Sequence, residues 1–299
     1  MAIPRLSFGA LTPLISAWDD LVAFCQELEA LGFDTIWVPD HFKFRQPRFE
    51  AWTALAGLAC HTRSVRIGTL VTSTAYRNPA LFAMQVLTLD HLSRGRLELG
   101  LGAGYDPDGA DHAAIGLTSW EPPERMQRFR EALEIVDRLL HGETVSFAGQ
   151  YYGVKDSTLA ARCLQSPRPP LTIAGYEPSM LSLAARYADT LNTGDLDVQR
   201  LVEPRAVFAA TRERYARLDE ICERLGRDPR SLARSMYRAG RPPAEDPWAS
   251  VDAFTEFVRR YRELGVSEFM FLCTPWDRER RPLFERIATG VMPSLRAST

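Results

Sequence analysis

The chain has 299 residues, of which 45% are hydrophobic and 25% are charged, and its formal net charge is −2. This composition is typical of a globular enzyme, and the length allows one large α/β barrel or two ordinary domains. The charge gives no reason to expect binding to nucleic acid or to a membrane surface. No apolar run reaches the roughly 18 residues that a membrane-spanning helix needs.

The N-terminal sequence and the cysteines indicate the compartment. Residues 1–14 contain no basic region followed by a long apolar core, so we expect no signal peptide. The five cysteines are far apart and form no CxxC pair. We therefore expect reduced, mostly buried thiols and a cytoplasmic protein.

Strands and helices alternate along the sequence. Residues 17–31 carry apolar side chains with a period near 3.6, and Gly32 predicts the C-terminal end of that helix. Asn78 and Pro79 predict the start of another helix, as its N-cap and first helical residue. The predicted strands are 6–11, 34–38, 65–72, 96–102, 171–174, 189–192, 232–238 and 268–274, and the predicted helices are 17–31, 49–62, 80–92, 124–141, 178–187, 198–225, 251–264 and 282–289.

This alternation of eight strands with helices predicts the α/β class and a (β/α)8 TIM barrel, formed as a single domain by residues 1–299. A doubly wound sheet is the alternative, which we disfavour because no linker divides the chain into halves. Two segments are too long for simple connections, and we expect them to be insertion loops at the C-terminal face of the barrel. They are the polar loop 105–123 and a hairpin within 143–170 that pairs residues 145–147 with 151–154.

Polar residues and glycines gather where the predicted strands end, which is where parallel α/β folds bind ligands. Asp40 and His41 follow the strand 34–38. A histidine there can exchange a proton with a ligand, because its unperturbed pKa lies near neutrality. The alternative is a solvent-facing loop histidine held by Asp40. No histidine has metal-ligand spacing, so we expect no metal site.

The segment Gly100-Leu-Gly-Ala-Gly104 does not match the dinucleotide fingerprint GxGxxG, and no helix begins within it. One interpretation is a strand end without side chains, against which a flat ring system can lie. A bulge or a packing role for the glycines is equally compatible with the sequence.

The turn from Ala174 to Ser179 joins a predicted strand to a helix start. Backbone N–H groups at such a position bind phosphate well. The alternative is an ordinary turn in which Glu177 or Ser179 caps the helix. No Ser-His-Asp set or nucleophile elbow is present, which argues against a serine hydrolase.

Four stretches together resemble the bacterial luciferase-like monooxygenase superfamily, and within it the oxidoreductases that use the deazaflavin coenzyme F420. The stretches are EALGFDTIWVPDHF (29–42), TRSVRIGTLVTSTAYRNPALFAMQVLTLDHLSRGRLELGLGAG (62–104), PPERMQRFREALEIVDRLLHGETVSFAGQYYGV (122–154) and PRPPLTIAGYEPSMLSLAARYADTLNTG (167–194). The resemblance covers about two thirds of the chain, from residue 6 to residue 194.

The resemblance implies roles beside the deazaflavin ring. Asp40 and His41 match the family's pair next to the ring, with His41 near the reactive carbon. The bond Thr69–Leu70 falls where the family has a non-proline cis peptide behind the ring. The residues that we expect to line the ring are Thr72, Gly102, Ala103 and Gly104.

The resemblance also implies where the anionic part of the coenzyme binds. The residues that match the phosphate loop are Ala174, Gly175, Tyr176, Glu177 and Ser179, and Arg125 matches a basic position near it. Because F420 carries a phosphate and an oligoglutamate tail, further basic residues should surround the mouth of the site. The candidates are Arg125, Arg128 and Lys43.

Two departures from the family's sugar-phosphate dehydrogenase branch bear on the substrate. Tyr105 stands where that branch has a glutamate, and an acidic residue expected after the first strand is absent from residues 9–15. We therefore expect hydride transfer that reduces an activated C=C or C=N bond of a small molecule, or the reverse oxidation. His41 would exchange the proton, with Tyr105 as the second candidate.

Two other classes of function share the fold, and the oligomeric state is a further expectation. The first class is an FMN-dependent monooxygenase. The second is a barrel that binds its ligand without catalysis, which the intact cofactor motifs disfavour. We also expect the protein to act as a homodimer.

Overall fold

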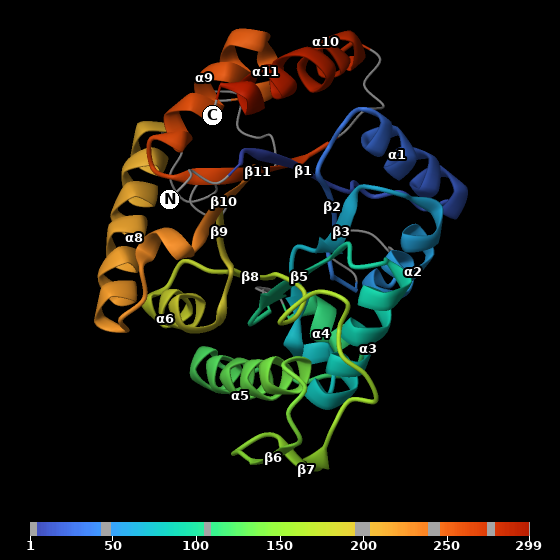
Figure 1. Ribbon diagram of the computed structural model, residues 1–299, viewed down its shortest axis with the longest axis vertical. Coiled ribbons are helices and arrows are strands. Elements are labelled where there is room, and N and C mark those ends of the chain that lie inside the picture. The colour runs from blue at the N-terminus through green and yellow to red at the C-terminus, as the bar shows by residue number, and fades with distance from the viewer. Residues whose placement is uncertain are drawn as a thin grey trace. The chain divides into compact units, whose positions relative to one another are not determined.

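A computed structural model describes residues 5–42, 49–104, 109–194, 204–238, 246–273 and 279–298. Over these residues, parallel strands alternate with helices in the order of a (β/α)8 barrel, so the predicted fold class is confirmed (Figure 1). Tyr105 and Lys43, which have predicted roles, lie outside the described residues. None of the helices in the described ranges is long and apolar enough to cross a membrane.

The bounds of the elements follow the predicted order. The strands are β1 (Ser7–Leu11), β2 (Thr35–Val38), β3 (Arg66–Thr69), β4 (Thr72–Ser73), β5 (Leu97–Gly102), β6 (Val145–Ala148), β7 (Gly153–Ser157), β8 (Leu171–Ala174), β9 (Thr190–Gly194), β10 (Ala233–Arg238) and β11 (Val266–Leu272). The helices are α1 (Trp18–Ala30), α2 (Ala51–His61), α3 (Pro79–Leu92), α4 (Ala110–Ala114), α5 (Pro122–Leu140), α6 (Pro178–Tyr187), α8 (Pro204–Arg224), α9 (Val251–Arg262), α10 (Arg281–Arg286) and α11 (Met292–Ala297), with short 3₁₀ turns at Thr74–Tyr76, Pro229–Ser231 and Pro247–Ala249.

The predicted start of α3 and the predicted end of α1 agree with the structure. The Asn78 side chain accepts hydrogen bonds from the N–H groups of Ala80 and Leu81, at 3.0 and 3.2 Å, as an N-cap does. Gly32 has a φ of +82°, which L side chains rarely adopt, so the chain leaves α1 there without strain.

Three predicted segments differ from the structure. The predicted strand 65–72 is divided into β3 and β4, and the predicted loop 105–123 contains α4. The predicted last helix, 282–289, extends through a π-helical turn, η5 (Ile287–Val291), into α11. Pro293 in α11 has no N–H and cannot join a regular α-helical ladder, so the continuation requires irregular geometry before it.

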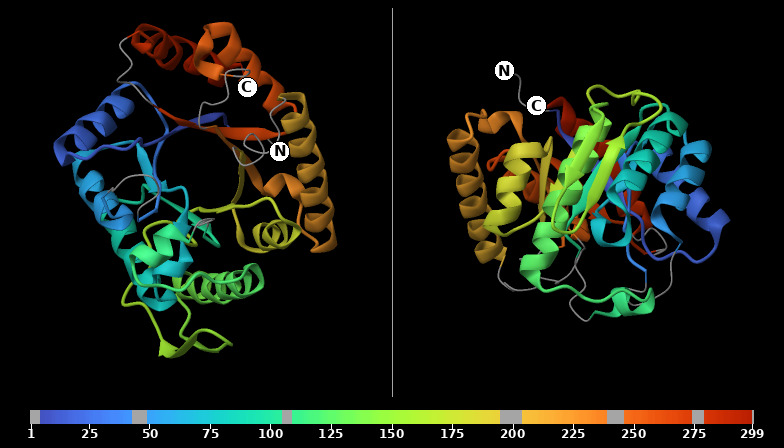
Figure 2. Two further views of the ribbon diagram at one scale, coloured as in Figure 1. Left: turned by 180° about the vertical axis from the view of Figure 1, so that it is seen from behind. Right: turned by 90° about the horizontal axis from the view of Figure 1, so that it is seen from below.

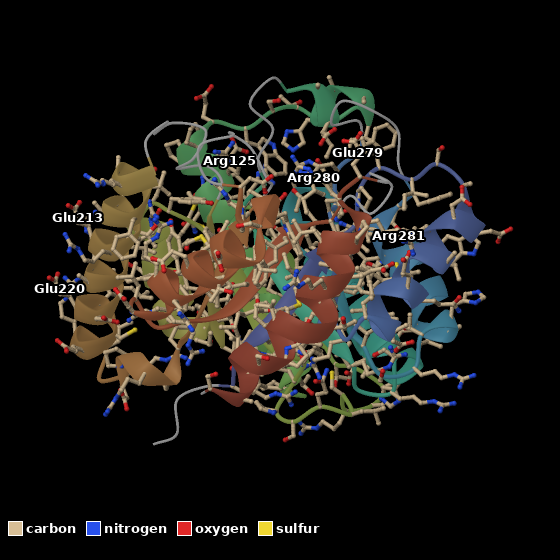
Figure 3. The ribbon with its side chains drawn as sticks, turned by 90° about the horizontal axis from the view of Figure 1, so that it is seen from above. Arg125, Glu213, Glu220, Glu279, Arg280 and Arg281 are labelled. Atoms are coloured by element: carbon tan, nitrogen blue, oxygen red, sulfur yellow. The ribbon has the colours of Figure 1, made fainter. Side chains whose placement is uncertain are left out.

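The chain divides into two compact units. The first contains Met1–Pro13, Phe24–Trp37 and Gly175–Thr299. Its strands pair in parallel in the order β2-β1-β11-β10-β9, with Gly9 opposite both Thr35 and Met270. Helix α6 packs against α8 (Figure 2), and the outer face of α8 exposes the charged Glu213 and Glu220 (Figure 3).

The second unit contains Leu14–Ala23 and Val38–Ala174. In it, β5 pairs in parallel with β3, β4 and β8. Strands β6 and β7 form the predicted antiparallel hairpin, although its strands pair Phe147 with Val154 and Ala148 with Gly153, so that Tyr151 and Tyr152 belong to the turn. This unit carries the carboxyl ends of β2, β3 and β5.

The five cysteines are free, and Cys25, Cys222 and Cys273 are buried. Burial raises the pKa of Cys25 to about 12. Three of the five thiols are buried, in agreement with the expectation, while their reduced state stays a prediction.

Candidate active site

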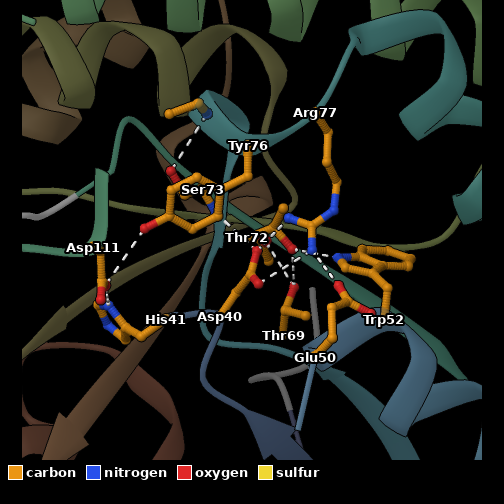
Figure 4. Close-up of polar contacts among 12 residues, drawn as sticks. Asp40, His41, Glu50, Trp52, Thr69, Thr72, Ser73, Tyr76, Arg77 and Asp111 are labelled. Carbon is orange, nitrogen blue, oxygen red and sulfur yellow. Dashed lines mark hydrogen bonds and ion pairs between the residues drawn. The ribbon is translucent and has the colours of Figure 1, made fainter. Parts of the chain in front are cut away.

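Asp40 follows β2 and is separated from it by Pro39, and only 7% of the residue is exposed. Arg77 donates to both carboxylate oxygens, at 2.5 and 3.2 Å, and the backbone N–H of Ser73 donates at 3.3 Å (Figure 4). Asp40 therefore ties the segment after β4 to the end of β2. Both carboxylate oxygens of Asp40 accept hydrogen bonds from the protein. Asp40 therefore fixes the positions of Ser73 and Arg77 and does not present an unpaired carboxylate to a ligand.

Arg77 connects the Asp40 carboxylate to the start of α2. Its guanidinium also donates to Glu50, which is the N-cap of α2 and accepts from the N–H of Thr53 at 2.7 Å. Burial by itself lowers the pKa of Arg77, but the carboxylates of Asp40 and Glu50 raise it above its ordinary value. Burial raises the pKa of Asp40, and the neighbouring guanidinium opposes that rise.

A chain of buried hydroxyl groups holds β3, β4 and β5 together. The Trp52 indole N–H donates to Thr72 Oγ1 at 2.9 Å, and the hydroxyls of Thr72 and Thr69 are 2.7 Å apart. Thr69 Oγ1 donates to the carbonyl oxygen of Gly100 at 3.0 Å. Each hydroxyl thus both donates and accepts, and both threonines are fully buried.

The cis peptide of this segment is Leu70–Val71, so the predicted position Thr69–Leu70 is wrong by one residue. Thr69 is the last residue of β3, and its hydroxyl donates across to β5. The Leu70 N–H donates to the Val38 carbonyl oxygen at 3.1 Å, so bonding to the end of β2 extends to the residue before the cis bond.

The glycines of β5 make room for this segment. A Cβ on Gly100 would lie 1.8 Å from the Thr69 carbonyl oxygen, and one on Gly102 would lie 2.6 Å from Val71 Cγ2. Gly104 has a φ of +87°, and a Cβ there would lie 2.9 Å from Ser73 Oγ. The packing interpretation of Gly100 and Gly102 is therefore supported, while contact of Gly102, Ala103 and Gly104 with a ring stays a prediction.

The hydrogen-bond partner of His41 is Asp111, which lies 70 residues later in the sequence. Its Nδ1 lies 3.0 Å from Oδ2 of Asp111, on α4, and the Tyr76 hydroxyl donates to the same oxygen at 3.4 Å (Figure 4). The His41 side chain is 26% exposed, whereas Asp111 is buried. The predicted alternative, in which Asp40 holds His41, is not what the structure has, because Arg77 and Ser73 engage Asp40.

Helix α5 carries the two arginines that are predicted to lie near the anion, Arg125 and Arg128, and their surroundings differ. The Arg128 guanidinium lies between the rings of Trp120 and Tyr151, 4.2 and 4.1 Å from their centroids, and pairs with Glu124 at 2.8 Å. Arg125, in the first turn of α5, is half-buried and has no ion pair within the described part of the chain (Figure 3). Of the two, Arg125 is the better placed to bind an anion.

The predicted phosphate loop follows β8. The Gly175 N–H donates to the Asn192 carbonyl oxygen at 3.2 Å, and a Cβ on Gly175 would lie 2.4 Å from Met180 Cβ. Glu177 is the N-cap of α6 by position, but its side chain makes no capping hydrogen bond, and Ser179 is exposed. Tyr176 lies under the Arg214 guanidinium, 4.8 Å from the ring centroid. Since no side chain caps α6, the predicted alternative of a self-capped turn is not supported.

Residues 4–268 match the model of the luciferase-like monooxygenase family. The chain belongs to this family. It is 31% identical to an F420-dependent glucose-6-phosphate dehydrogenase of Beutenbergia cavernae, over 93% of this chain and 94% of that protein. It is 34% identical to a 5,10-methylenetetrahydromethanopterin reductase of Archaeoglobus fulgidus, over 57% of this chain and 47% of that protein. The chain likewise spans about half the length of other curated relatives that it matches.

The fold is that of a solved F420-dependent tetrahydromethanopterin reductase from Methanopyrus kandleri. The match has a TM-score of 0.77 at 17% identity and covers 97% of this chain and 99% of that one. The predicted family, its F420-dependent branch and the oxidoreductase class are confirmed by these comparisons.

The sequence does not predict three residues that the structure places at this site, Tyr76, Arg77 and Asp111. Arg77 lies between a predicted strand and a predicted helix, and nothing local indicates that it pairs with a carboxylate 37 residues earlier. Asp111 is one of several acidic residues in the segment 105–123, which the sequence predicts to be a loop. Its helix, α4, is only five residues long, too short for a periodic signal.

Proposed function

We propose that this luciferase-like protein transfers a hydride between coenzyme F420 and a small organic substrate, reducing an activated C=C or C=N bond or catalysing the reverse oxidation. The observation that carries the proposal is His41, a partly exposed imidazole at the end of β2 whose Nδ1 is held by a buried carboxylate. A histidine held in this way is suited to proton exchange. The family relationship supports the choice of coenzyme.

The residues present fit the anionic part of F420. Arg125 is a half-buried cation without an ion pair in the described ranges, and the start of α6 has no side-chain cap. Both features favour a bound anion, because an unpaired guanidinium and uncapped N–H groups need acceptors. The resemblance assigns the phosphate to the backbone of 175–179, and Arg125 is a separate candidate contact for the anionic part of the coenzyme. When bound, the coenzyme supplies the hydride chemistry, while the protein supplies orientation and a proton.

The proposed substrate differs from that in the name of the relative from Beutenbergia cavernae. That relative is named for glucose 6-phosphate. Tyr105 of this chain replaces the glutamate that the resemblance leads us to expect in such enzymes, so we propose that a sugar phosphate is not the substrate. Tyr105 stays the second candidate for the proton exchange.

Equilibrium binding to the purified protein tests the coenzyme. Oxidised F420 and FMN are titrated separately at low and high salt and followed by absorbance. We expect F420 to bind more tightly and to weaken as ionic strength rises, because charge–charge attraction near a surface is screened. Arg125→Gln should weaken F420 binding and its salt dependence, whereas Arg130→Gln, at an exposed position of the same helix, should not. Tighter FMN binding without salt dependence would assign the protein to the flavin enzymes instead.

Substitution of His41 tests the proton exchange. His41→Ala should slow single-turnover hydride transfer by about 10²–10⁴-fold, the usual contribution of general acid–base catalysis, with little loss of F420 affinity. His41→Asn retains a hydrogen-bonding group but cannot titrate, so it should bind F420 normally and react slowly. An unchanged transfer rate in His41→Ala would end this role and direct the test to Tyr105.

We also propose that the whole chain, residues 1–299, acts as one domain, and that it forms a homodimer. The family match extends over segments of both compact units, which supports the first point. Helix α3 exposes Leu81 and Met84, each 55% exposed, and such apolar surface is typical of an interface. Sedimentation velocity should give a dimer, and Leu81→Glu combined with Met84→Glu should give a monomer.

A further inference from the structure

Three side chains that are distant in the sequence meet at one carboxylate oxygen. Oδ2 of Asp111 is 3.0 Å from Nδ1 of His41 and 3.4 Å from the Tyr76 hydroxyl (Figure 4). Asp111 is 2% exposed, although its helix α4 lies in a segment that the sequence predicts to be an irregular loop. A buried carboxylate needs donors, because an unpaired buried charge is strongly unfavourable. Tyr76 and His41 provide two.

The 3.0 Å contact by itself fits either tautomer of His41, and the ionisation of Asp111 decides which nitrogen carries hydrogen. An ionised carboxylate only accepts hydrogen bonds, so Nδ1 must be the N–H of the neutral ring. Nε2 is then the nitrogen without hydrogen in the neutral ring. A carboxylate that orients a histidine and stabilises its charged form in this way makes a large contribution in serine proteases.

Asp40 is adjacent to His41 in the sequence but is committed elsewhere. Its oxygens accept from Arg77 and from the Ser73 N–H. The two carboxylates near His41 therefore have separate tasks: Asp40 orders the loop after β4, and Asp111 faces the imidazole. We propose that Asp111 is a positioning residue that sets the Nδ1–H tautomer of His41, and that the Tyr76 hydroxyl orients Asp111. This inference rests on the proposed role of His41 for its catalytic consequence but not for the tautomer.

The tautomer can be measured in the protein without coenzyme, by ¹⁵N chemical shifts of the imidazole nitrogens at neutral pH. The His41 signals are assigned by their loss in His41→Ala. We expect the Nδ1–H tautomer in the wild type. In Asp111→Asn the side-chain amide can donate to Nδ1, so the ring should shift to the Nε2–H tautomer or a mixture. Asp252→Asn, at an exposed position of α9, is the matched control and should leave the spectrum unchanged.

Kinetics give the second readout. Single-turnover hydride transfer at saturating F420 should fall by about 10²-fold or more in Asp111→Asn, with F420 affinity retained. Tyr76→Phe should lower the rate by about 2–10-fold, less than Asp111→Asn, because the 3.4 Å hydrogen bond to the carboxylate is long. Circular dichroism and thermal unfolding show whether each variant remains folded.

Each outcome decides a different claim. An unchanged His41 tautomer in Asp111→Asn overturns the positioning role. A changed tautomer with a wild-type transfer rate overturns it as well, provided that His41→Ala itself is slow. A wild-type rate in His41→Ala refutes the acid–base function itself, and the tautomer measurement then still judges Asp111 independently. A substituted Asp111 that merely loosened the fold would lower F420 affinity and thermal stability together with the rate, which would also overturn the proposal.

Discussion

Glu131→Gln should detach the β6–β7 hairpin from α5. Glu131 is 4% exposed, and its Oε1 accepts from Gln127 Nε2 and the Gln150 N–H, both at 3.0 Å. Its Oε2 accepts from the N–H groups of Tyr151 and Tyr152, at 2.9 and 3.0 Å. A glutamine has one oxygen, so its NH₂ would face two of these donors. At about 1–3 kcal/mol for each buried donor without an acceptor, we expect a destabilisation of about 2–4 kcal/mol after local relaxation.

Hydrogen exchange and urea unfolding measure this effect. The amides of residues 150–152 should exchange much faster in Glu131→Gln, and the urea midpoint should fall. Glu134→Gln changes a partly exposed carboxylate of the same helix, 40% exposed, and should leave both unchanged. Equal exchange rates in the two variants would refute the view that Glu131 anchors the hairpin.

The effect should also depend on pH. Burial by itself raises the pKa of Glu131, but the hydrogen bonds that it accepts lower it below its ordinary value. Its contribution to stability is therefore complete above the unfolded-state pKa, near 4.3, and is lost as the pH falls through the lowered pKa of the folded state. The difference in unfolding free energy between wild type and Glu131→Gln should be largest at neutral pH and shrink on acidification. A difference that grows in acid would contradict this assignment.

Two further substitutions test the contacts that hold β3, β5 and the end of β2 in place. Gly100→Ala would place a Cβ 1.8 Å from the Thr69 carbonyl oxygen, and it should lower the free energy of unfolding by at least about 1–3 kcal/mol. At Gly290 a Cβ would meet nothing within 4 Å, so Gly290→Ala should be neutral or stabilising. Thermal unfolding of both variants measures the difference. Arg77→Lys keeps the charge but loses the bidentate contact with Asp40, so it should lower the free energy of unfolding by about 1–3 kcal/mol. In a double-mutant cycle with Asp40→Asn, a coupling energy near zero would show that this contact does not stabilise the protein.

The sequence alone determined the order of elements and several of their ends. The apolar period of α1, the glycine after it and the Asn-Pro start of α3 are local signals, because they reflect hydrogen bonds and contacts within about four residues along the chain. Strand β8, at Leu171–Ala174, agrees with the predicted range. The four family stretches led to the F420-dependent branch, because their order and spacing follow the strand ends that form the site.

Only the tertiary structure decided which polar groups meet. Asp40 pairs with Arg77 across 37 residues, and His41 meets Asp111 across 70. Side chains this far apart in sequence come together because parallel strands place their carboxyl ends at one edge, and no periodicity within a single segment encodes which of them will touch. The same reason explains the glycines of β5: Gly100 is required by a carbonyl oxygen of β3, a neighbour that the sequence around Gly100 does not contain.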